Sequence, residues 1–380
     1  MIDKTNIRDI PEIYSGNFPQ DYVNGIDGWN FSREELEKNK GKLLTMDIDF
    51  GNDCNFISCP HCFRRGGKLE KESGPPLTYK ETTSLIEQAK VLGLRSVKFL
   101  GAGEPFEERN LLEFLEFLKN NEVKPLIFTK GHIIGDNLFA HGFHRYHGGN
   151  DSQKLAERLY ELDAKILLGF RSFNHAKEDR NVGMQGYSEK RDRALRVLVE
   201  TGFNKTNPTS MGLMPLPITK ENYDEAFEIY EFGKRRNMGI IVTPTMVSGR
   251  CAKKSYRKVI DITDEQKIEL YRKIYAWNIK NGIQTPDDLK RDGLSAYAGE
   301  FPCQQVGCGL YVTLDGTVLR CPGDDVTVFG NVREKPLKDI WEGSENYARA
   351  GTYNCRCPPK DGVTIPNNLY TEVIRRLEIS

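Results

Sequence analysis

The chain has 380 residues, more than one average domain, which favours a large catalytic domain with a smaller module attached. Its 54 basic residues balance its 54 acidic ones, so the chain as a whole lacks the basic excess that is typical of nucleic-acid binders. No segment reaches the roughly 20 apolar residues that a transmembrane helix needs, so a membrane protein is not expected.

The chain contains nine cysteines, most of them clustered. Residues 1–16 lack the apolar core of a secretory signal, so a cytoplasmic location is expected. In a reducing compartment, clustered cysteines bind metals or act in catalysis more often than they form disulfides.

From residue 43 the chain alternates between expected strands and helices, after a polar and irregular stretch at 1–42. Strands are expected at 43–50, 96–100, 125–129, 165–170, 210–213 and 239–243, and helices at 78–92, 110–119, 152–162, 187–200 and 220–236. This alternation implies βα units and a parallel sheet, which either closes into a full or partial barrel or lies open as a doubly wound sheet. In both arrangements, ligands bind at the C-terminal ends of the strands.

Residues 131–150 interrupt the alternation and are expected to form a long loop. The loop contains four histidines: His132, His141, His144 and His147. Their spacing does not match one face of a helix, so substrate contact or a solvated loop is favoured over a metal site.

Beyond residue 250 the alternation stops. A helix is expected at 262–281, a hairpin with an Asp315-Gly316 turn at 310–321, and a closing helix at 367–378. The expected division is an N-terminal extension, a βα domain, a helical linker, a cysteine-rich module and a C-terminal helix, at 1–42, 43–250, 251–298, 299–358 and 359–380.

Three cysteines directly follow the first expected strand. Cys54, Cys59 and Cys62 have the spacing Cys-x4-Cys-x2-Cys on one short loop. Three thiolates can hold three irons of a cubane cluster and leave the fourth iron open to a substrate or cofactor. The alternative is a zinc site with His61 as the fourth ligand, although His61 lies between two cysteines, where its ring would have difficulty turning inward.

The three-cysteine loop, followed by Gly101-Ala102-Gly103-Glu104-Pro105, resembles the radical S-adenosylmethionine (radical SAM) superfamily. The usual spacing there is Cys-x3-Cys-x2-Cys, so this chain has one extra residue in the first gap. The resemblance implies that the open iron of a [4Fe-4S] cluster binds S-adenosylmethionine. An electron then cleaves the cofactor to a 5′-deoxyadenosyl radical, which abstracts a substrate hydrogen. It also implies a partial (β/α)6 barrel of the TIM type, and an electron donor such as flavodoxin or ferredoxin.

The resemblance further implies cofactor contacts for six residues of this chain: Gly101, Gly103, Glu104, Thr129, Ser172 and Arg193. The two glycines and Glu104 match a segment that contacts the methionine amino group. Arg193 is similar in position to an arginine that pairs with the methionine carboxylate in some relatives. An exposed helix arginine is the alternative for Arg193.

Five more cysteines follow residue 300: Cys303, Cys308, Cys321, Cys355 and Cys357. The pattern Cys303-x12-Gly316-x4-Cys321 resembles the SPASM/twitch extension of some radical SAM proteins, in which a hairpin carries two ligands of an auxiliary [4Fe-4S] cluster. The resemblance implies that Cys355 and Cys357 complete this cluster, and the low number of cysteines fits the single-cluster twitch form better than a full SPASM module. Cys308 is surplus: it could replace a ligand, act as a catalytic thiol near the substrate, or be buried and inert. A zinc-binding tail is the alternative for the whole group.

The expected function is that of a radical SAM enzyme with an auxiliary cluster. Only about 42 residues precede the first strand, too few for the peptide-recognition domain of many peptide-modifying relatives. This favours a small polar substrate, similar to a sugar, cyclitol or nucleoside, and a reaction of oxidation (dehydrogenation) or epimerisation. In an oxidation the auxiliary cluster could accept the second electron, and in an epimerisation Cys308 could donate the quenching hydrogen atom. The first alternative is radical modification of a ribosomally made peptide, and the second is a non-catalytic zinc or iron–sulfur protein.

Overall fold

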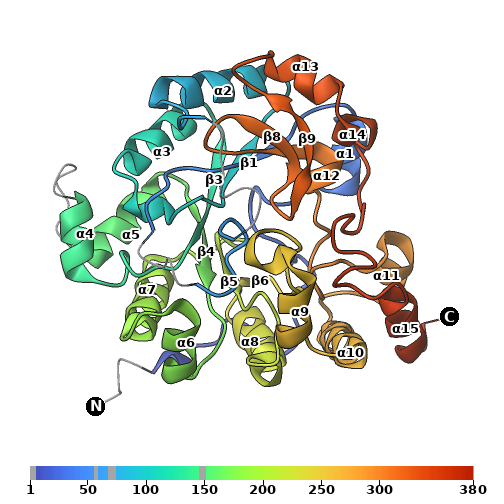
Figure 1. Cartoon of the computed structure of the whole chain (residues 1–380). Helices are drawn as coiled ribbons and strands as arrows, with labels where there is room; N and C mark the ends of the chain where they lie inside the picture. Colours follow the sequence, from blue (N-terminus) through green and yellow to red (C-terminus); the bar gives the residue numbers. More distant parts are fainter. Residues whose placement is uncertain (1–5, 55–58, 67–73, 145–150, 380) are drawn as a thin grey trace.

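Six parallel strands form the centre of the molecule in the computed structural model, which describes residues 6–54, 59–66, 74–144 and 151–379 (Figure 1). They are β1 (Thr45–Ile48), β2 (Ser96–Phe99), β3 (Lys124–Thr129), β4 (Lys165–Gly169), β5 (Met211–Met214) and β6 (Gly239–Ile240). Each strand pairs in parallel with the next one in the chain. This order confirms the predicted partial (β/α)6 barrel.

Helices follow the strands and lie around the outside of the sheet in Figure 1. The five predicted ones are α2 (Tyr79–Val91), α3 (Leu111–Asn120), α5 (Ser152–Glu161), α7 (Tyr187–Thr201) and α8 (Tyr223–Arg235). Helix α2 begins at a capping box, in which Thr78 and Glu81 each accept a hydrogen bond from the other's backbone N–H. The inner faces of these helices bury leucines and other apolar residues against the strands, and this burial holds the barrel together.

The prediction of one long loop over residues 131–150 is wrong in part, because helix α4 (Asn137–His144) lies within it. The Asp136 carboxylate accepts hydrogen bonds from the backbone N–H groups of Leu138 (2.9 Å) and Phe139 (3.3 Å), which stabilises the first turn. His132 is buried 3.3 Å from Glu107, and His141 is exposed. The side chain of His144 and all of His147 lie outside the described residues.

Further short helices were not expected from the sequence. They are α1 (Arg33–Lys38), α6 (His175–Val182), α9 (Lys254–Ile260), α11 (Pro286–Asp292), α12 (Gln305–Cys308), α13 (Leu337–Glu342) and α14 (Glu345–Ala348), with 3-10 turns at Ile7–Asp9, Pro105–Glu107 and Gly249–Ala252. The N-terminal residues also pack on the barrel, since Ile26 forms a β-bridge with Thr209.

The C-terminal hairpin continues the barrel sheet. Strand β7 (Gly309–Val312) pairs in parallel with β1, and β8 (Thr317–Cys321) and β9 (Asp324–Asn331) follow in antiparallel order. The predicted turn is confirmed by Gly316, whose φ of +86° suits glycine. One nine-stranded sheet, in the order β6-β5-β4-β3-β2-β1-β7-β8-β9, therefore joins the barrel to the cysteine-rich module.

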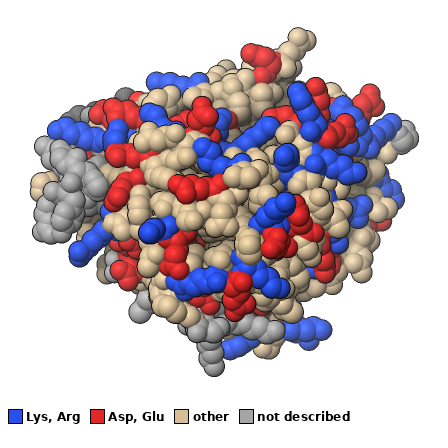
Figure 2. Space-filling view, turned by 90° about the horizontal axis from the view of Figure 1, so that it is seen from above, with Lys and Arg blue, Asp and Glu red and all other residues tan. Residues whose placement is uncertain are grey.

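Two helices near the C-terminus match the predictions, α10 (Asp264–Lys280) and α15 (Leu369–Arg376). On the face shown in Figure 2, basic and acidic side chains of the described residues are interspersed. None of the helices in the described ranges combines the length and the apolar character that crossing a lipid bilayer requires.

Candidate active site

The loop after β1 carries Cys54, Cys59 and Cys62, and a buried ion pair fixes it to the sheet. Arg64 lies 2.7 Å from the carboxylate of Asp49, and both side chains are almost completely buried. The Tyr311 hydroxyl on β7 donates a 2.6 Å hydrogen bond to the same carboxylate. Because a buried pair with additional hydrogen bonds is costly to break, it holds the end of the loop close to β1.

A second contact fixes the same loop from the segment after β6. The backbone N–H of Arg250 donates to the Cys62 carbonyl (3.0 Å), and its guanidinium donates to the Cys59 carbonyl (2.7 Å). The Tyr256 hydroxyl donates to the Pro60 carbonyl (2.9 Å). These bonds engage the backbone of the loop, and the Cys62 thiol accepts a hydrogen bond from the Arg65 backbone N–H (3.3 Å).

The glycine-rich turn after β2 packs directly against the residue that precedes Cys54. A Cβ atom on Gly103 would lie 2.1 Å from the Asp53 carbonyl oxygen, so a larger residue does not fit there. Gly101 has a φ of +73°, which favours glycine. The backbone N–H of Glu104 donates to the Asp53 carbonyl (2.8 Å), which ties the turn to the cysteine loop.

Glu104 is buried at the end of this turn. Its carboxylate accepts hydrogen bonds from the Thr129 hydroxyl (2.5 Å) and from the Lys130 backbone N–H (2.8 Å). Burial raises the pKa of Glu104, and the positive charge of His132 and these hydrogen bonds oppose the rise. The carboxylate therefore links the ends of β2 and β3 beside the cysteine loop.

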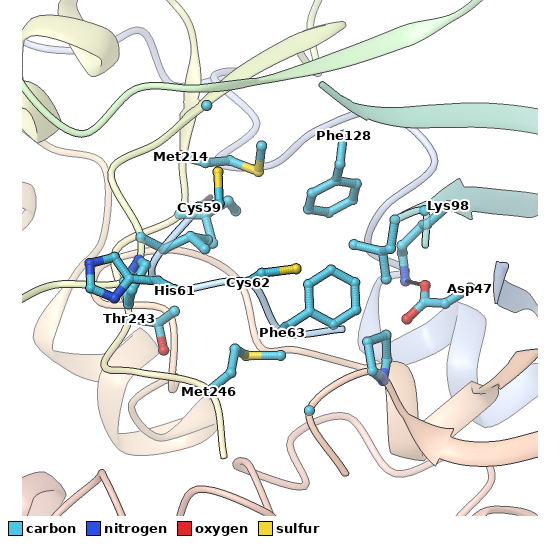
Figure 3. A pocket seen from close by; sticks show the side chains of 18 of the residues that line it. Asp47, Cys59, His61, Cys62, Phe63, Lys98, Phe128, Met214, Thr243 and Met246 are labelled. Atoms are coloured by element: carbon cyan, nitrogen blue, oxygen red, sulfur yellow. Dashed lines mark ion pairs between the residues drawn. The ribbon is translucent and has the colours of Figure 1, made fainter. Parts of the chain in front are cut away.

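A cavity of about 290 Å³ brings the two groups of cysteines together. Six cysteines line it: Cys54, Cys59, Cys62, Cys303, Cys321 and Cys357. Four of the residues predicted to bind the cofactor line it as well: Gly101, Gly103, Glu104 and Thr129. Figure 3 shows Cys59 and Cys62 among the side chains that project into the cavity.

The two cysteine groups lie at opposite ends of β1. Cys54 follows the C-terminal end of β1, whereas Cys321 ends β8 at the level of Gly309, which pairs with Thr45 at the start of β1. The four residues of β1 span roughly 10 Å at 3.3 Å per residue. The cavity between the groups can therefore hold a substrate with one cysteine group on each side.

The structure places four other predicted site residues away from the cavity lining. Ser172 is buried and its hydroxyl donates to Glu225 (2.8 Å), while Arg193 is exposed on α7. Cys308 is buried in a small apolar cluster, and its thiol lies 3.3 Å from the Gln304 carbonyl. Cys355 lies near Cys303, outside the lining.

Sequence reasoning missed a polar group on the cavity wall between the two cysteine groups. Asp47 on β1 and Lys98 on β2 are register partners, and their charged atoms lie 3.6 Å apart, both almost fully buried (Figure 3). Lys98 also donates to the Gln305 side chain (3.1 Å) and lies 5.2 Å from the centre of the Trp29 ring. The inward-facing positions of barrel strands are usually hydrophobic. The charged residues Asp47 and Lys98 inside two expected strands could therefore have indicated this polar group from the sequence.

Burial raises the pKa of Asp47 to about 6, although the nearby Lys98 charge lowers it. One carboxylate oxygen of Asp47, Oδ1, has no hydrogen-bond partner. Its charged neighbour, Lys98 Nζ, lies 3.6 Å away, beyond hydrogen-bond distance, so this buried carboxylate on the cavity wall is suited to bind a substrate hydroxyl or to accept a proton.

Positive charge lines the cavity near Cys59. Arg171, at the end of β4, is buried, and it donates to the Thr219 hydroxyl (3.1 Å). Burial and the charges of Arg171 and Lys130 lower the pKa of His61 to about 3, so this imidazole is neutral at pH 7. The arrangement can bind a carboxylate close to the first cysteine group.

Burial favours the protonated thiol at two of the downstream cysteines, Cys321 and Cys357. Burial raises the pKa of Cys357 to about 12 despite the opposing charge of Lys360, and burial together with the nearby Cys357 and Cys303 raises that of Cys321. A metal cluster deprotonates its thiol ligands, so this donor set fits a bound iron–sulfur cluster. Among the described residues, no three cysteine, histidine or carboxylate side chains converge closely enough for a single metal ion.

Comparisons with known proteins match both parts of the chain. A model of the SPASM family, an iron-sulfur cluster-binding domain, matches residues 303–358. The chain is 24% identical over 372 residues to Fe-coproporphyrin III synthase of Methanosarcina barkeri, covering 91% of this chain and 86% of the relative. It is 21% identical over 333 residues to AdoMet-dependent heme synthase of the same organism, covering 82% of this chain and 85% of the relative.

Solved structures show a similar fold. Native anSMEcpe with bound AdoMet has a TM-score of 0.60 at 16% identity, covering 88% of this chain and 98% of that one. Streptococcus suis SuiB bound to the precursor peptide SuiA has a TM-score of 0.54 at 17% identity, covering 84% and 70%. The partial barrel, the three-cysteine loop and the matched C-terminal domain are together similar to iron–sulfur proteins of the radical SAM class.

The SPASM match, the two relatives that align along most of the chain and the shared fold all support a radical SAM enzyme with a C-terminal SPASM domain. The predicted resemblance is thereby confirmed, and the cofactors of this family, S-adenosylmethionine and [4Fe-4S] clusters, are those expected from the sequence. The number of clusters in the C-terminal domain and the individual ligands stay predictions.

Proposed function

We propose that this enzyme oxidises a small polar molecule that carries a hydroxyl or amino group, at a carbon held between two [4Fe-4S] clusters. The observation that carries this proposal is the cavity lined by cysteines of both groups, with Asp47 and Lys98 on the wall between them. The same cavity would also hold the cofactor beside the first cysteine group, so the space left between the groups favours a compact substrate over a folded partner.

Residues of the first group would hold the catalytic cluster and its cofactor. Cys54, Cys59 and Cys62 supply three thiolates, which leaves one iron open for S-adenosylmethionine. Glu104, buried and already bound to Thr129, is placed to accept the methionine amino group. Arg171 lines the cavity near Cys59 whereas Arg193 is exposed, so Arg171 is the better candidate to bind the methionine carboxylate.

Oxidation of an alcohol to a ketone removes a hydrogen atom, a proton and an electron. When bound, S-adenosylmethionine and the two clusters supply the acceptors of the hydrogen atom and of the electron. The chain itself supplies the acceptor of the proton, and Asp47 is the buried carboxylate on the cavity wall that can take it. Lys98, 3.6 Å away, stabilises the carboxylate form of Asp47 and can orient the substrate oxygen.

Oxidation is favoured over epimerisation because of where Cys308 lies. An epimerase needs a hydrogen donor beside the substrate radical, and Cys308 is buried outside the cavity lining. Cys303, Cys321 and Cys357, with Cys355 next to Cys303, would instead hold the auxiliary cluster that accepts the electron.

Anaerobic reconstitution tests the proposal. The full chain should bind about eight irons, four for each cubane, and should release 5′-deoxyadenosine when dithionite, or a flavodoxin or ferredoxin, supplies electrons. A zinc protein would bind little iron and leave S-adenosylmethionine intact, which would contradict the proposal.

The substrate class is tested with a panel of polyols, aminocyclitols and nucleosides, with short peptides and Fe-coproporphyrin III as competing classes. Peptides are included because SuiB and anSMEcpe have been solved with bound peptides, and the porphyrin because of the name of the 24% identical relative. The expected product has lost two hydrogen atoms from a small alcohol or amine. A product of unchanged composition that gains solvent deuterium would indicate epimerisation, and turnover of only the peptide or the porphyrin would overturn the proposed substrate class.

A further inference from the structure

In the part of the chain that the structure describes, buried lysines are paired with carboxylates, with one exception. Among the described residues, five lysines are buried: Lys98, Lys165, Lys234, Lys267 and Lys360. Lys98 pairs with Asp47, Lys165 with Asp27, Lys234 with Glu300 and Lys267 with Asp264. Within the same described residues, no carboxylate pairs with Lys360.

Lys360 is 2% exposed, and neutral groups satisfy part of its hydrogen-bonding capacity. Its amine donates to the Thr243 hydroxyl (2.9 Å) and to the Pro244 carbonyl (3.0 Å), both just beyond β6. A buried ammonium without an opposite charge is unfavourable, and an ion pair normally offsets this penalty. Among the described residues, therefore, no carboxylate supplies the negative counter-charge that this buried amine needs.

The groups beside Lys360 that can carry a negative charge are cysteine thiols. Burial lowers the pKa of Lys360, and negative charge on Cys357, Cys303 and Cys321 opposes that effect. Lys360 and these three cysteines line the same cavity. Thiols are neutral when protonated, so they become counter-charges only when a metal cluster holds them as thiolates.

We propose that Lys360 is the buried counter-cation of the auxiliary cluster and raises its reduction potential, so that this cluster can accept an electron from the substrate. The inference rests on the proposed function, because it takes Cys303, Cys321 and Cys357 as cluster ligands. A cubane with thiolate ligands carries net negative charge, and each added electron makes it more negative. A fixed positive charge in a low-dielectric site stabilises the reduced form more than the oxidised one.

Other charged groups near these cysteines are already compensated or partly solvated. Asp324 lies 3.1 Å from Arg320, and Asp361 is half-exposed and accepts a hydrogen bond from the Tyr370 hydroxyl (3.2 Å). Arg349 acts on Cys355, but its side chain is exposed, so solvent screens its charge. Lys360 is therefore the charge whose removal should act most strongly on this cluster.

The test is a redox titration of the reconstituted full chain, monitored by electron paramagnetic resonance. The auxiliary signal is identified in the variant that lacks Cys54, Cys59 and Cys62. Lys360→Met and Lys360→Gln remove the charge, and Lys360→Gln retains a donor for Thr243 in case the apolar variant fails to fold. Lys360→Arg retains the charge, and Lys335→Met makes the same substitution at an exposed position of the same domain.

We expect the midpoint potential of the auxiliary cluster to fall in Lys360→Met and Lys360→Gln, and to stay near the wild-type value in Lys360→Arg and Lys335→Met. Equal potentials in wild type and Lys360→Gln, with both clusters present, would overturn this inference alone. A KM change for the substrate with unchanged potential would likewise overturn it, because Lys360 would then be a substrate contact. A wild-type chain that binds only about four irons, one cubane, would overturn the ligand assignment and with it the proposed function.

Discussion

The two cysteine groups are built in different ways, although they line one cavity. In the first group, Cys54, Cys59 and Cys62 lie within nine residues on one loop, and their side chains are partly exposed. In the second, Cys303, Cys321 and Cys357 come from three separate segments; Cys321 is buried, whereas Cys303 and Cys357 are partly exposed like the first group. The first group is thus a local feature of the sequence, and the second exists only after β7 and β8 have joined the sheet.

This difference fits the task proposed for each group. A partly exposed cluster with an open iron must admit S-adenosylmethionine and receive an electron from a partner protein. A cluster that exchanges electrons with the substrate benefits from buried neighbours such as Cys321 and Lys360, because a charge acts strongly where water is excluded. The continuous pairing β2-β1-β7-β8 fixes the distance between the two sites.

The largest effect on activity is expected when the first cysteine group is removed. Replacement of Cys54, Cys59 and Cys62 by alanine should abolish cleavage of S-adenosylmethionine and remove about four irons, the content of one cubane. The control is the same measurement on Cys251→Ala, because Cys251 is buried and lies outside the cavity lining. Retained cleavage in the triple variant would show that the catalytic cluster lies elsewhere.

Removal of the second cysteine group should separate cleavage of S-adenosylmethionine from oxidation of the substrate. In Cys321→Ala and Cys357→Ala, the auxiliary iron should be lost and oxidised product should fall at least tenfold, while reduction by dithionite still yields 5′-deoxyadenosine. Cys308→Ala is the matched control, since Cys308 lies in the same domain but outside the cavity lining, and its iron content should equal that of wild type. Loss of iron in Cys308→Ala instead would make Cys308 a ligand.

The contrast between the groups also explains what could be predicted from the sequence. The Cys54 loop and the turn at Gly101–Glu104 follow strands directly, so their spacing alone predicted that they would meet at the C-terminal strand ends. The hairpin around Gly316 was predicted for the same local reason. The pairing of β7 with β1 was not, because no local pattern encodes which strand covers an open sheet edge.

The direction in which side chains point was the second feature that the sequence did not predict. Ser172 and Arg193 were placed at the cofactor from their positions along the chain, yet Ser172 turns to Glu225 and Arg193 faces solvent, whereas Arg171 lines the cavity. A shift of one residue in a strand reverses the face on which a side chain lies. Lys360 could not be found at all from the sequence, because its significance is the missing carboxylate in its surroundings.

A smaller effect, on the free energy of unfolding, is expected at Asp47, on the cavity wall between the two cysteine groups. Burial raises the pKa of Asp47 to about 6 from its ordinary value of 3.8, so the folded state binds this proton more tightly than the unfolded state. The contribution of protonated Asp47 to the free energy of unfolding is fully present below about pH 4 and is lost as the pH rises through about 6. For a pKa difference of about two units, this loss is roughly 3 kcal/mol. Lys98 is the charge that faces Asp47 from β2, and Tyr297 is a further titratable group nearby.

The measurement is urea unfolding of the cluster-free protein at pH 4 and pH 7, for wild type and Asp47→Asn. Because asparagine does not titrate, the wild-type free energy of unfolding should fall relative to the variant between these two pH values. Parallel changes in both proteins would show that Asp47 titrates normally, and its proposed part in proton transfer would lose its physical basis.

The smallest effect is expected at the contact between the glycine turn and the first cysteine loop. In Gly103→Ala the new Cβ would lie 2.1 Å from the Asp53 carbonyl oxygen, so the turn and the loop must move apart. Overpacking of this kind costs about 1–3 kcal/mol, measured as the free energy of unfolding. Gly16→Ala is the control, because a Cβ there meets no neighbouring atom within 4 Å. The separation should also displace Cys54 and weaken binding of the first cluster while the second keeps its iron. Equal loss of both clusters would mean that the two groups form one cooperative unit through the shared sheet.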